Sequence, residues 1–596
     1  MIISIMTNLE IATLLRKIAA AYQILEENRF KIIAYDRAAD SIEHLTSETK
    51  DLWDNGKLDE IPGVGSGIAH YLDELFRTGK VKHFDDVMKR VPKGVFPLLS
   101  VPGLGPKKAH KLVTELRLKG AKDVVGALDA AAKAGKIAPI EGFGEKSQED
   151  IISAIATYKR GQIKENRMEL PVADAIAQEI MAHLKKHSAV VRVDALGSLR
   201  RKVSTVGDID IAAATKKPEE VTLHFLDYPH QKLVEQGPGG ATILLKNGRQ
   251  VDLRVQRPDA YGAMLQYFTG SKHHNIKLRS YGLTKRKSLS EHGIKEVKTG
   301  SMRYFHTEEA FYKELGLPWI APEMREDKGE IEAAQAGKLP KLVETQDIKG
   351  DLHIHTNYDL ESSHDLGVDS LADHLTKAAE LDYEYIGLSD HNPSITNHTE
   401  NQIIDIMKRR KAKYEQLYSS WVKKVSRKCQ MFVMCEVDIL PDGKLALPEK
   451  AFEFVDAVIV SIHSSFTQDK KHMTDRIVRA VGAHPKVRIL GHPTGRLLLK
   501  REGVNADWAA VFAACKKHDV ALEINAYPSR LDLPDDLVFD ALREGLRFCI
   551  DTDAHAVGQM EMMKYGVSVS RRGWATKGDI VNALGYNEFK DWLLKI

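Results

Sequence analysis

The sequence has few cysteines and no long apolar run. Its 596 residues include four cysteines, and their spacing does not match a paired metal motif, so we expect reduced, mostly buried thiols. No apolar segment approaches the ~20 residues that a membrane-spanning helix needs. The N-terminus also lacks the basic-then-apolar order of a secretory signal peptide. These absences argue against a membrane or disulfide-rich secreted protein and predict a cytoplasmic protein with no membrane contact.

Composition and charge are those of a large globular protein. Hydrophobic residues make up 43% and charged residues 28% of the chain, and its length implies several domains. The formal net charge of +3 is unevenly distributed, because residues 1–346 are net basic and residues 347–596 are net acidic. A basic front half fits contact with nucleic acid, and an acidic back half fits carboxylate-rich metal chemistry.

Two aspartates one residue apart, Asp208 and Asp210, follow a tight turn at Gly197 and Ser198. Alternation along a β-strand would place both carboxylates on one face. Two carboxylates on one face repel each other unless a cation lies between them, and hard oxygen ligands suit Mg²⁺ that is also bound by substrate phosphates. An isolated pair of this kind more often lies on a solvated strand face, so the pair alone does not establish a catalytic site.

A third aspartate, Asp252, strengthens the prediction. It lies in residues 250–255, where polar and apolar side chains alternate as in a half-buried strand. If that strand neighbours the first, Asp252 completes a nest of three carboxylates that can bind two metal ions. The pattern predicts a phosphoryl-transfer site.

Glycine-rich turns recur in the basic half. Residues 61–69 and 101–109 share the order apolar-Pro-Gly-apolar-Gly before a helical segment, and residues 141–146 form a weaker copy. Glycines let a backbone approach a phosphate, and the helix N-terminus offers unpaired N–H groups to it. One such turn is only a turn, but its repetition resembles helix-hairpin-helix motifs, which bind DNA backbones. The glycines predicted to approach DNA are Gly63, Gly65, Gly103 and Gly105.

In the back half, histidines and carboxylates follow a series of apolar, strand-like runs. Side chains at the carboxyl ends of successive βα strands converge on one mouth of a barrel. Six histidines and two carboxylates at such positions are difficult to explain as structural residues, and imidazole with carboxylate suits Zn, Mn or Fe. They are His353, His355, His391, Glu436, His463, His492, Asp553 and His555.

The order of the front-half motifs, ending in Tyr267-Phe268-Thr269-Gly270-Ser271, resembles the DNA polymerase X family over residues 8–325. The resemblance implies that Asp208 and Asp210 bind two Mg²⁺ or Mn²⁺ ions. It implies that Asp252 binds the catalytic ion and helps accept the proton of the primer 3′-hydroxyl. The residues that it places around the incoming nucleotide are Gly197, Ser198, Arg201, Gly207, Tyr267, Phe268, Gly270, Asn275 and Arg279.

The chain departs from the pattern of the family that it resembles at some positions. Close relatives of polymerase β use a lysine to form a Schiff base with a deoxyribose phosphate, and Tyr71 stands there, so the sequence predicts that lyase activity is lost. Lys31 matches a position associated with the 5′-phosphate of gapped DNA. Lys272, His274 and Ile276 also differ, which predicts a different nucleotide affinity and fidelity.

Residues 347–596 resemble the polymerase and histidinol phosphatase (PHP) domain, a distorted β/α barrel that hydrolyses phosphoesters. The resemblance implies that the eight residues after the strands bind up to three Mn²⁺ or Zn²⁺ ions. Family members commonly carry Ser-Asp-Gly soon after the first His-x-His, which this chain lacks. Asp359, Glu361 or His364 could supply the missing ligand. Residues 523–525 and 571–574 also match the family, but the sequence assigns them no chemistry.

The predicted fold is multidomain, α+β and α/β. Its expected parts are a helical domain with a helix-hairpin-helix (1–88), fingers with a second hairpin (89–154), a nucleotidyltransferase palm (155–257), a thumb (258–325), a linker (326–346) and the PHP barrel (347–596).

The predicted function is short-gap filling in DNA repair by a monomer that uses gapped or primer-template DNA and dNTPs. The barrel is expected to act as a 3′-5′ exonuclease or 3′-end phosphoesterase. Two alternatives stay open: the barrel as a structural module or small-molecule phosphatase, and the whole chain as a non-catalytic DNA-binding scaffold.

Overall fold

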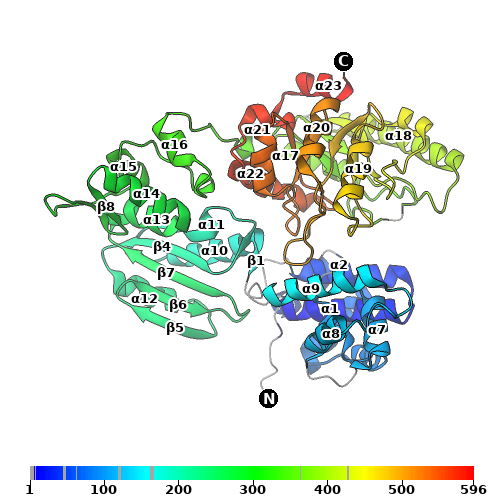
Figure 1. The fold of residues 1–596 in the computed structure, drawn as a ribbon, viewed down its shortest axis with the longest axis horizontal. Helices are drawn as coiled ribbons and strands as arrows, with labels where there is room; N and C mark the ends of the chain where they lie inside the picture. Colours follow the sequence, from blue (N-terminus) through cyan, green and yellow to red (C-terminus); the bar gives the residue numbers. More distant parts are fainter. Residues whose placement is uncertain are drawn as a thin grey trace.

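Three bodies make up the computed structural model (Figure 1). The helical N-terminal body lies below the C-terminal barrel, and a central α+β body lies beside both. The structure describes residues 6, 8–43, 49–54, 56–61, 63–101, 103–118, 123–161, 167–362, 364–425 and 429–595.

The N-terminal body is helical throughout. One apolar cluster runs from Ile11 to Ile155, so the boundary predicted after residue 88 falls inside a continuous core. The domain boundaries therefore stay a prediction. The elements are α1 (Asn8–Ile24), α2 (Arg29–Glu43), α3 (Thr49–Asp54), η1 (Leu58–Glu60), α4 (Ser66–Thr78), α5 (Lys82–Lys89), α6 (Val95–Leu98), α7 (Pro106–Glu115), α8 (Val124–Lys133) and α9 (Glu145–Gly161).

A five-stranded sheet in the order β2-β4-β7-β6-β5 forms the centre of the α+β body. β4 and β7 are parallel neighbours, and the other pairs are antiparallel. The elements are β1 (Met168–Glu169), α10 (Leu170–Leu184), β2 (Val190–Ala195), α11 (Gly197–Arg200), β3 (Thr205–Val206), β4 (Ile209–Thr215), α12 (Pro218–Leu226), β5 (Lys232–Gly237), β6 (Gly240–Leu244) and β7 (Gln250–Gln256).

The two faces of β4 pack against different helices. Ile209 and Ile211 belong to the core with α10 and α12, whereas Ala212 and Ala214 pack with α13 (Tyr261–Thr269). Because successive side chains of a strand point to opposite faces, Asp210 shares the face of α13. The structure thus confirms that successive side chains of residues 209–214 alternate between the two faces of β4.

The thumb and the segment after it share one apolar core. Ile331, Ala334 and Leu342 pack there with thumb residues, so much of the predicted linker 326–346 is folded against the thumb. Gly329, Gly337 and the charged residues of the segment account for its loop-like composition. The elements are η4 (Pro258–Ala260), α14 (Lys272–Thr284), β8 (Lys287–Ser290), β9 (Gly293–Glu296), β10 (Met302–Arg303), α15 (Glu308–Glu314), η5 (Pro322–Met324), α16 (Glu330–Gln335) and η6 (Thr345–Asp347).

Seven parallel strands form the C-terminal sheet in chain order, β11 to β17. A bridge between Ile354 and Ala554 joins the first strand to the segment after the last, which nearly closes the sheet into a barrel. The strands are β11 (Gly350–Ile354), β12 (Tyr385–Leu388), β13 (Gln430–Asp438), β14 (Ala457–Ser461), β15 (Val487–Leu490), β16 (Ala521–Asn525) and β17 (Phe548–Asp551).

Helices surround the barrel, and α23 (Tyr586–Leu594) closes its amino-terminal end. There the Phe589 ring stacks on Tyr385 with centroids 4.2 Å apart, over the core residues Leu352 and Phe432. The opposite, carboxyl-terminal ends of the strands carry the predicted ligands. The other elements are α17 (Leu371–Glu380), α18 (Glu400–Val422), η7 (Glu449–Phe454), α19 (Lys470–Val481), α20 (Trp508–His518), α21 (Asp535–Arg543), η8 (Val557–Met562), α22 (Met563–Arg572), η9 (Lys577–Asp579) and η10 (Val581–Ala583).

One expectation from composition is met in the fold. All four cysteines are free and buried, as the sequence predicted. Across the described part of the chain, no helix combines the length and apolar character that crossing a membrane requires.

The helical body touches the barrel through α2. The Nη2 group of Arg37 donates to the carbonyl oxygen of Leu366 at 3.3 Å and lies 3.6 Å from the carboxylate of Asp365. Asp40 lies 3.9 Å from the ammonium group of Lys500. The carboxyl-terminal mouth of the barrel therefore faces the N-terminal body.

Candidate active sites

The parallel pairing of β4 and β7 brings the three aspartates together. Asp210 is directly opposite Asp252 in the register, and Asp208 precedes β4 on the same edge. Asp252 is buried, and it accepts hydrogen bonds from the hydroxyl of Thr242 and from Gln250 Nε2, the latter at 2.9 Å. The orientation of this carboxylate is thus fixed by its neighbours in the sheet.

Burial and neighbouring negative charge raise the pKa values of Asp208 and Asp210. Burial, followed by the charges of Asp252 and Asp208, raises the pKa of Asp210 to about 6. Burial and Asp252 also raise the pKa of Asp208. Negative charge concentrated in this way favours a bound cation, and carboxylate oxygens are the ligands that Mg²⁺ and Mn²⁺ prefer. The residues therefore fit a divalent metal site.

The Gly-Ser turn before the aspartates requires glycine. Gly197 has φ of +56°, and a Cβ atom there would lie 2.3 Å from Oδ2 of Asp210. Leu196 N donates to Asp210 O at 2.8 Å, which ties the turn to β4. Ser198 lies in α11 (Gly197–Arg200), directly after Gly197. Gly207 immediately precedes the aspartates, and a Cβ there would lie 3.6 Å from Arg167.

Arg201 lies between the turn and the thumb. Its Nη1 group donates to the carbonyl oxygen of Thr269, and its Nε donates to Glu326 at 3.0 Å. Gly270 has φ of +69°, and a Cβ there would lie 3.1 Å from Arg201 Nη1. The structure thus brings Arg201 against the predicted Thr269-Gly270-Ser271 segment.

Other predicted nucleotide contacts cluster on α13 and α14. Asn275 donates to the carbonyl oxygen of Tyr267 at 2.7 Å and accepts from Gln266 at 2.8 Å. Tyr267 and Phe268 meet edge to face, with ring centroids 5.1 Å apart. Arg279 is exposed one turn beyond Asn275 on α14. By contrast, His274 is fully buried, 2.6 Å from Glu330, so this departure from the family is part of the core.

The hairpin glycines lie where the sequence placed them. Gly63 and Gly103 have φ of +76° and +77°, and Gly65 and Gly105 cap α4 and α7. All four are exposed, which leaves the N-termini of both helices accessible to a phosphate. The prolines of both motifs, residues 62 and 102, lie outside the described residues.

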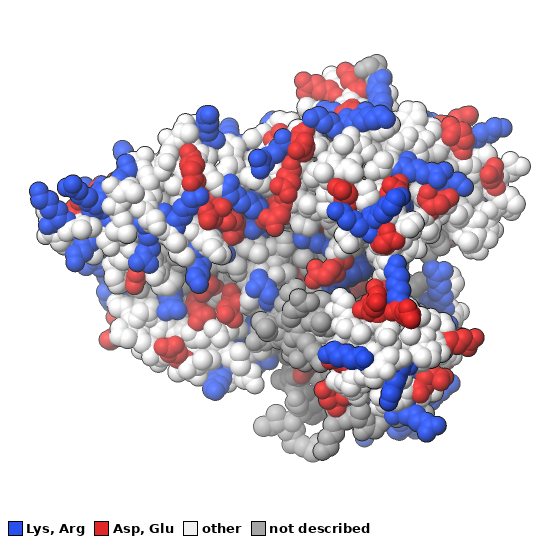
Figure 2. Space-filling view, in the orientation of Figure 1, with Lys and Arg blue, Asp and Glu red and all other residues white. Residues whose placement is uncertain are grey.

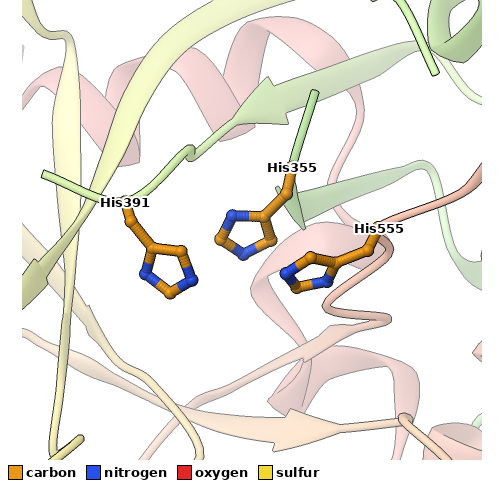
Figure 3. Close-up of side chains that lie close together, drawn as sticks. All are labelled: His355, His391 and His555. Atoms are coloured by element: carbon orange, nitrogen blue, oxygen red, sulfur yellow. The ribbon is translucent and has the colours of Figure 1, made fainter. Parts of the chain in front are cut away.

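The eight predicted ligands of the barrel meet at the carboxyl-terminal ends of its strands. Figure 3 shows the rings of His355, His391 and His555 gathered around one point. Four sets of ligand atoms lie within 4.8 Å of one another: His355, His391 and His555; His364, His391 and His463; His353, His355 and Asp553; and Glu436, His463 and His492.

Glu436 is at the centre of this cluster. Its Oε1 lies 2.9 Å from Nε2 of His492 and 3.3 Å from Nε2 of His463. Its Oε2 lies 3.2 Å from Nε2 of His353 and 3.0 Å from Nδ1 of His391. Oε2 also lies 3.5 Å from Nε2 of His355, so one carboxylate faces five imidazoles.

Several buried ligand atoms of the cluster have no hydrogen-bond partner among the described residues. They are His353 Nε2, both ring nitrogens of His355, His391 Nδ1, His492 Nδ1, His555 Nε2 and Glu436 Oε2. Leaving such atoms unpaired costs roughly 1–3 kcal/mol each, so convergent orphaned nitrogens indicate metal binding. Burial and nearby positive charge lower the pKa of His355 and of His492 to about 3, which keeps both imidazoles neutral and able to bind a metal at neutral pH.

Comparison with known proteins identifies the helix-hairpin-helix and thumb parts of the front half. The DNA polymerase beta thumb family matches residues 264–326, a helix-hairpin-helix domain matches 6–81, and a SAM-like helix-hairpin-helix tandem matches 56–119 and 95–157. DNA polymerase lambda of Rattus norvegicus is 25% identical over 349 residues, covering 54% of this chain and 56% of the relative.

A bacterial relative extends the similarity over both halves. The DNA polymerase/3'-5' exonuclease PolX of Bacillus subtilis (strain 168) is 32% identical over 587 residues, which are 98% of this chain and 99% of the relative. The chain belongs to the family X DNA polymerases. The predicted family and fold class are thereby confirmed, including the barrel as part of the same chain.

Of the three candidates for the missing ligand of this family X chain, the structure brings one to the cluster. His364 lies with His391 and His463, and its Nε2 is 2.8 Å from Asp438. Asp359 accepts from the backbone N–H of Glu361, and Glu361 pairs with His398 away from the cluster.

The sequence analysis missed residues that surround the predicted ligands. Glu523 Oε1 lies 2.5 Å from Nδ1 of His353, and Asp438 lies 2.7 Å from Nδ1 of His463. Asp365 lies 4.0 Å from Nε2 of His555. Partners of this kind orient metal-binding histidines. Glu523 and Asp438 stand at strand ends like the ligands themselves, a signal that could have identified them; Asp365 is in a loop and had none.

In the helical body, aromatic rings surround Tyr71, which the sequence analysis matched to the lyase lysine. Tyr71 stacks on His83 with centroids 5.0 Å apart and an angle of 9°. His83 Nε2 lies 2.6 Å from the hydroxyl of Tyr22, and the Lys31 ammonium lies 4.0 Å from the centroid of the Tyr22 ring. The loss of lyase activity stays a prediction, and borohydride trapping on a deoxyribose-phosphate substrate would test it.

Proposed function

We propose that this family X chain fills short gaps in DNA from its palm and removes nucleotides from 3′ ends in its barrel. The observation that carries the first activity is the register that sets Asp210 opposite Asp252. The convergence of buried, orphaned imidazole nitrogens on Glu436 carries the second. The name of the Bacillus subtilis relative supports both a polymerase and a 3'-5' exonuclease, and the name of the Rattus norvegicus relative supports the polymerase.

In the palm, Asp208, Asp210 and Asp252 would hold Mg²⁺ or Mn²⁺. When bound, the cations neutralise charge on the triphosphate and on the attacking oxygen. Arg201 and the N–H groups of the Gly197 turn would grip the triphosphate, and an arginine can bind phosphate oxygens with two donors. Asp252, oriented by Thr242 and Gln250, would help accept the proton of the primer 3′-hydroxyl.

In the barrel, the eight strand-end residues and His364 would hold up to three ions, Mn²⁺ or Zn²⁺. When bound, such ions polarise a phosphodiester and activate water. Glu523 and Asp438 would keep His353 and His463 in the orientation that presents Nε2 to the cluster. His555 and Asp365 lie at the mouth, near where a DNA 3′ end would enter.

DNA would be held along its backbone. Figure 2 shows basic side chains gathered at the tip of the thumb, over β8. Exposed residues there include Lys285, Arg286, Lys295, Lys298 and Arg303. Together with the hairpin glycines, these side chains offer contacts to phosphates without reading bases.

A labelled primer on gapped DNA tests both activities in one assay. The purified protein is incubated with Mn²⁺, with and without dNTPs, beside the variants Asp252→Ala and His355→Ala. We expect Asp252→Ala to lose extension by more than about 100-fold and to keep shortening. His355→Ala should show the reverse loss.

Each outcome separates the alternatives. Extension without shortening in every protein would indicate that the barrel is a structural module or acts on small molecules. Binding of gapped DNA with neither activity would indicate a scaffold and would end the proposal. Loss of both activities in both variants would mean that the sites are not independent.

A further inference from the structure

An arginine of the barrel reaches the nucleotide site of the palm. Arg572 is the last residue of α22, and 6% of its side chain is exposed. Its Nη1 donates to the backbone carbonyl of Arg201 at 2.8 Å and to Oε1 of Glu326 at 2.9 Å. Its Nη2 donates to Asp535 at 2.9 Å.

The same oxygen of Glu326 also binds Arg201. Oε1 accepts from Arg201 Nε at 3.0 Å, so one carboxylate oxygen bridges two guanidinium groups. Arg572 thus holds Arg201 twice, directly at its backbone and indirectly through Glu326. Glu326 follows Arg325, whose carbonyl accepts from the backbone N–H of Ser271 at 3.1 Å. The carboxylate that joins the two arginines is therefore tied to the Thr269-Gly270-Ser271 turn beside the predicted nucleotide site.

Charges alternate along this link. Asp535, Arg572, Glu326 and Arg201 form a series of negative and positive groups, each within 3.0 Å of the next. Glu326 alone would offset the charge of Arg201, but Arg572 balances Glu326 in turn. The series ends with the positive Arg201 beside the turn at Gly197. The negative charge of a bound triphosphate would lie next to Arg201 and continue the alternation of charge.

The link also restricts the Arg201 side chain before nucleotide arrives. Nε is bound to Glu326 and Nη1 to Thr269. In the described part of the chain, no side chain accepts from the remaining nitrogen, Nη2, which leaves it for phosphate. An arginine fixed in its binding conformation loses less conformational freedom on binding than a free one.

We propose that Arg572 is a positioning residue of the polymerase site: through Glu326 it holds Arg201 in the conformation that grips the triphosphate. The inference rests on the proposed role of Arg201. It gives the barrel a part in nucleotide binding that is separate from its own chemistry. It also assigns a function to one residue of the run 571–574, to which the sequence analysis could assign none.

The neighbouring Arg571 is a matched control. It also joins the barrel to the front half, through Glu323 at 2.8 Å and the carbonyl of Val343 at 3.1 Å, but it has no contact with Arg201 or Glu326. Arg572→Met and Arg571→Met each remove one charged contact between the halves and keep an unbranched apolar stem at the position. Only the first breaks the link.

The test measures KM and kcat for dNTP on gapped DNA in the full-length protein, with the shortening rate and a melting curve for each variant. We expect Arg572→Met to raise KM about 3- to 10-fold, with kcat and shortening changed less than about 2-fold. Arg571→Met should leave KM unchanged. Arg572→Lys, which keeps the charge but cannot span all three acceptors, should recover part of the loss.

A second variant keeps the test decisive if Arg572→Met folds poorly. Glu326→Gln should raise KM by a similar factor, and Glu326→Gln combined with Arg572→Lys should raise it no further than the larger single effect, because both act on one link. Equal increases in the Arg571 and Arg572 variants, or an unchanged or lower KM in Arg572→Met and Glu326→Gln, would overturn the inference while leaving the polymerase intact. Absence of extension by the wild-type protein would instead refute the proposed function.

Discussion

The palm and the barrel each gather metal-binding groups, but they surround them differently. The palm offers three carboxylates of one charge on the edge of a sheet, and Asp208 is exposed. The barrel buries histidines around Glu436, with further carboxylates behind them at Glu523 and Asp438. The palm site is thus incomplete without cations and a substrate triphosphate, whereas the barrel supplies a nearly full set of ligands from its own strands.

That difference has an energetic consequence. In the palm, the unfavourable term is repulsion between like charges, which raises the pKa of Asp210. In the barrel, it is the desolvation of imidazole nitrogens that have no hydrogen-bond partner among the described residues. Bound metal would relieve both, but the barrel should hold its ions in the absence of substrate, and the palm should acquire its ions with nucleotide.

Among the predictions that separate the two sites, Glu436→Gln should cause the largest loss of activity. It removes the charge that faces five imidazoles, so shortening of a labelled primer should fall by more than about 100-fold. Extension should stay within about 2-fold. Glu449→Gln, an exposed position of the same domain, is the control. A parallel fall in extension would contradict the separation of the two sites.

Glu523→Gln should have a smaller effect, because it acts on a ligand rather than on the metal. The amide keeps the shape of the side chain but loses the charge beside His353 Nδ1. We expect a loss of about 10- to 100-fold in shortening or in metal affinity, measured by Mn²⁺ titration. The exposed Glu544→Gln should change neither. A variant with normal Mn²⁺ affinity and normal shortening would remove Glu523 from the site.

Asp210→Asn should change stability rather than the barrel's activity, and it should be stabilising. The pKa of Asp210 is raised to about 6, so the native state binds more protons than the unfolded state between about pH 4 and 6. Stability is therefore lost as pH rises through this window, by up to about 3 kcal/mol. With chelator at pH 8, the variant should need more denaturant to unfold, and at pH 4 the gain should vanish.

The control for that prediction is the exposed Asp227→Asn, which should show no gain at either pH. Added Mg²⁺ should reduce the advantage of Asp210→Asn, because the wild-type carboxylates then share their charge with a cation. If the variant is less stable than the wild type at pH 8, hydrogen bonding rather than repulsion dominates at Asp210.

Local patterns predicted the parts of both sites that local geometry determines. Strand alternation placed Asp208 and Asp210, and histidines after apolar runs marked the mouth of the barrel. The repeated glycine turns likewise precede helices α4 and α7, as their local pattern predicted. In each case the decisive interaction spans only a few residues.

What the sequence could not predict depends on contacts between distant segments. The choice of His364 over Asp359 and Glu361 follows from how one loop folds over the strand ends. The segment 326–346 has the composition of a linker, but its few apolar residues suffice to pack it against the thumb. The meeting of Arg572 with Glu326 leaves no pattern in either local sequence.

The ion pair between Glu326 and Arg572 joins residues 246 positions apart. The palm, the thumb and Glu326 are all synthesised before Arg572. At about 5–20 residues per second, a ribosome needs roughly 12–50 s to travel from one to the other. During that interval the palm and thumb are already made, but the side chain that completes the nucleotide cradle does not yet exist. The nascent chain would therefore grip dNTPs weakly until synthesis is almost over, which ties the onset of full polymerase activity to the completion of the barrel.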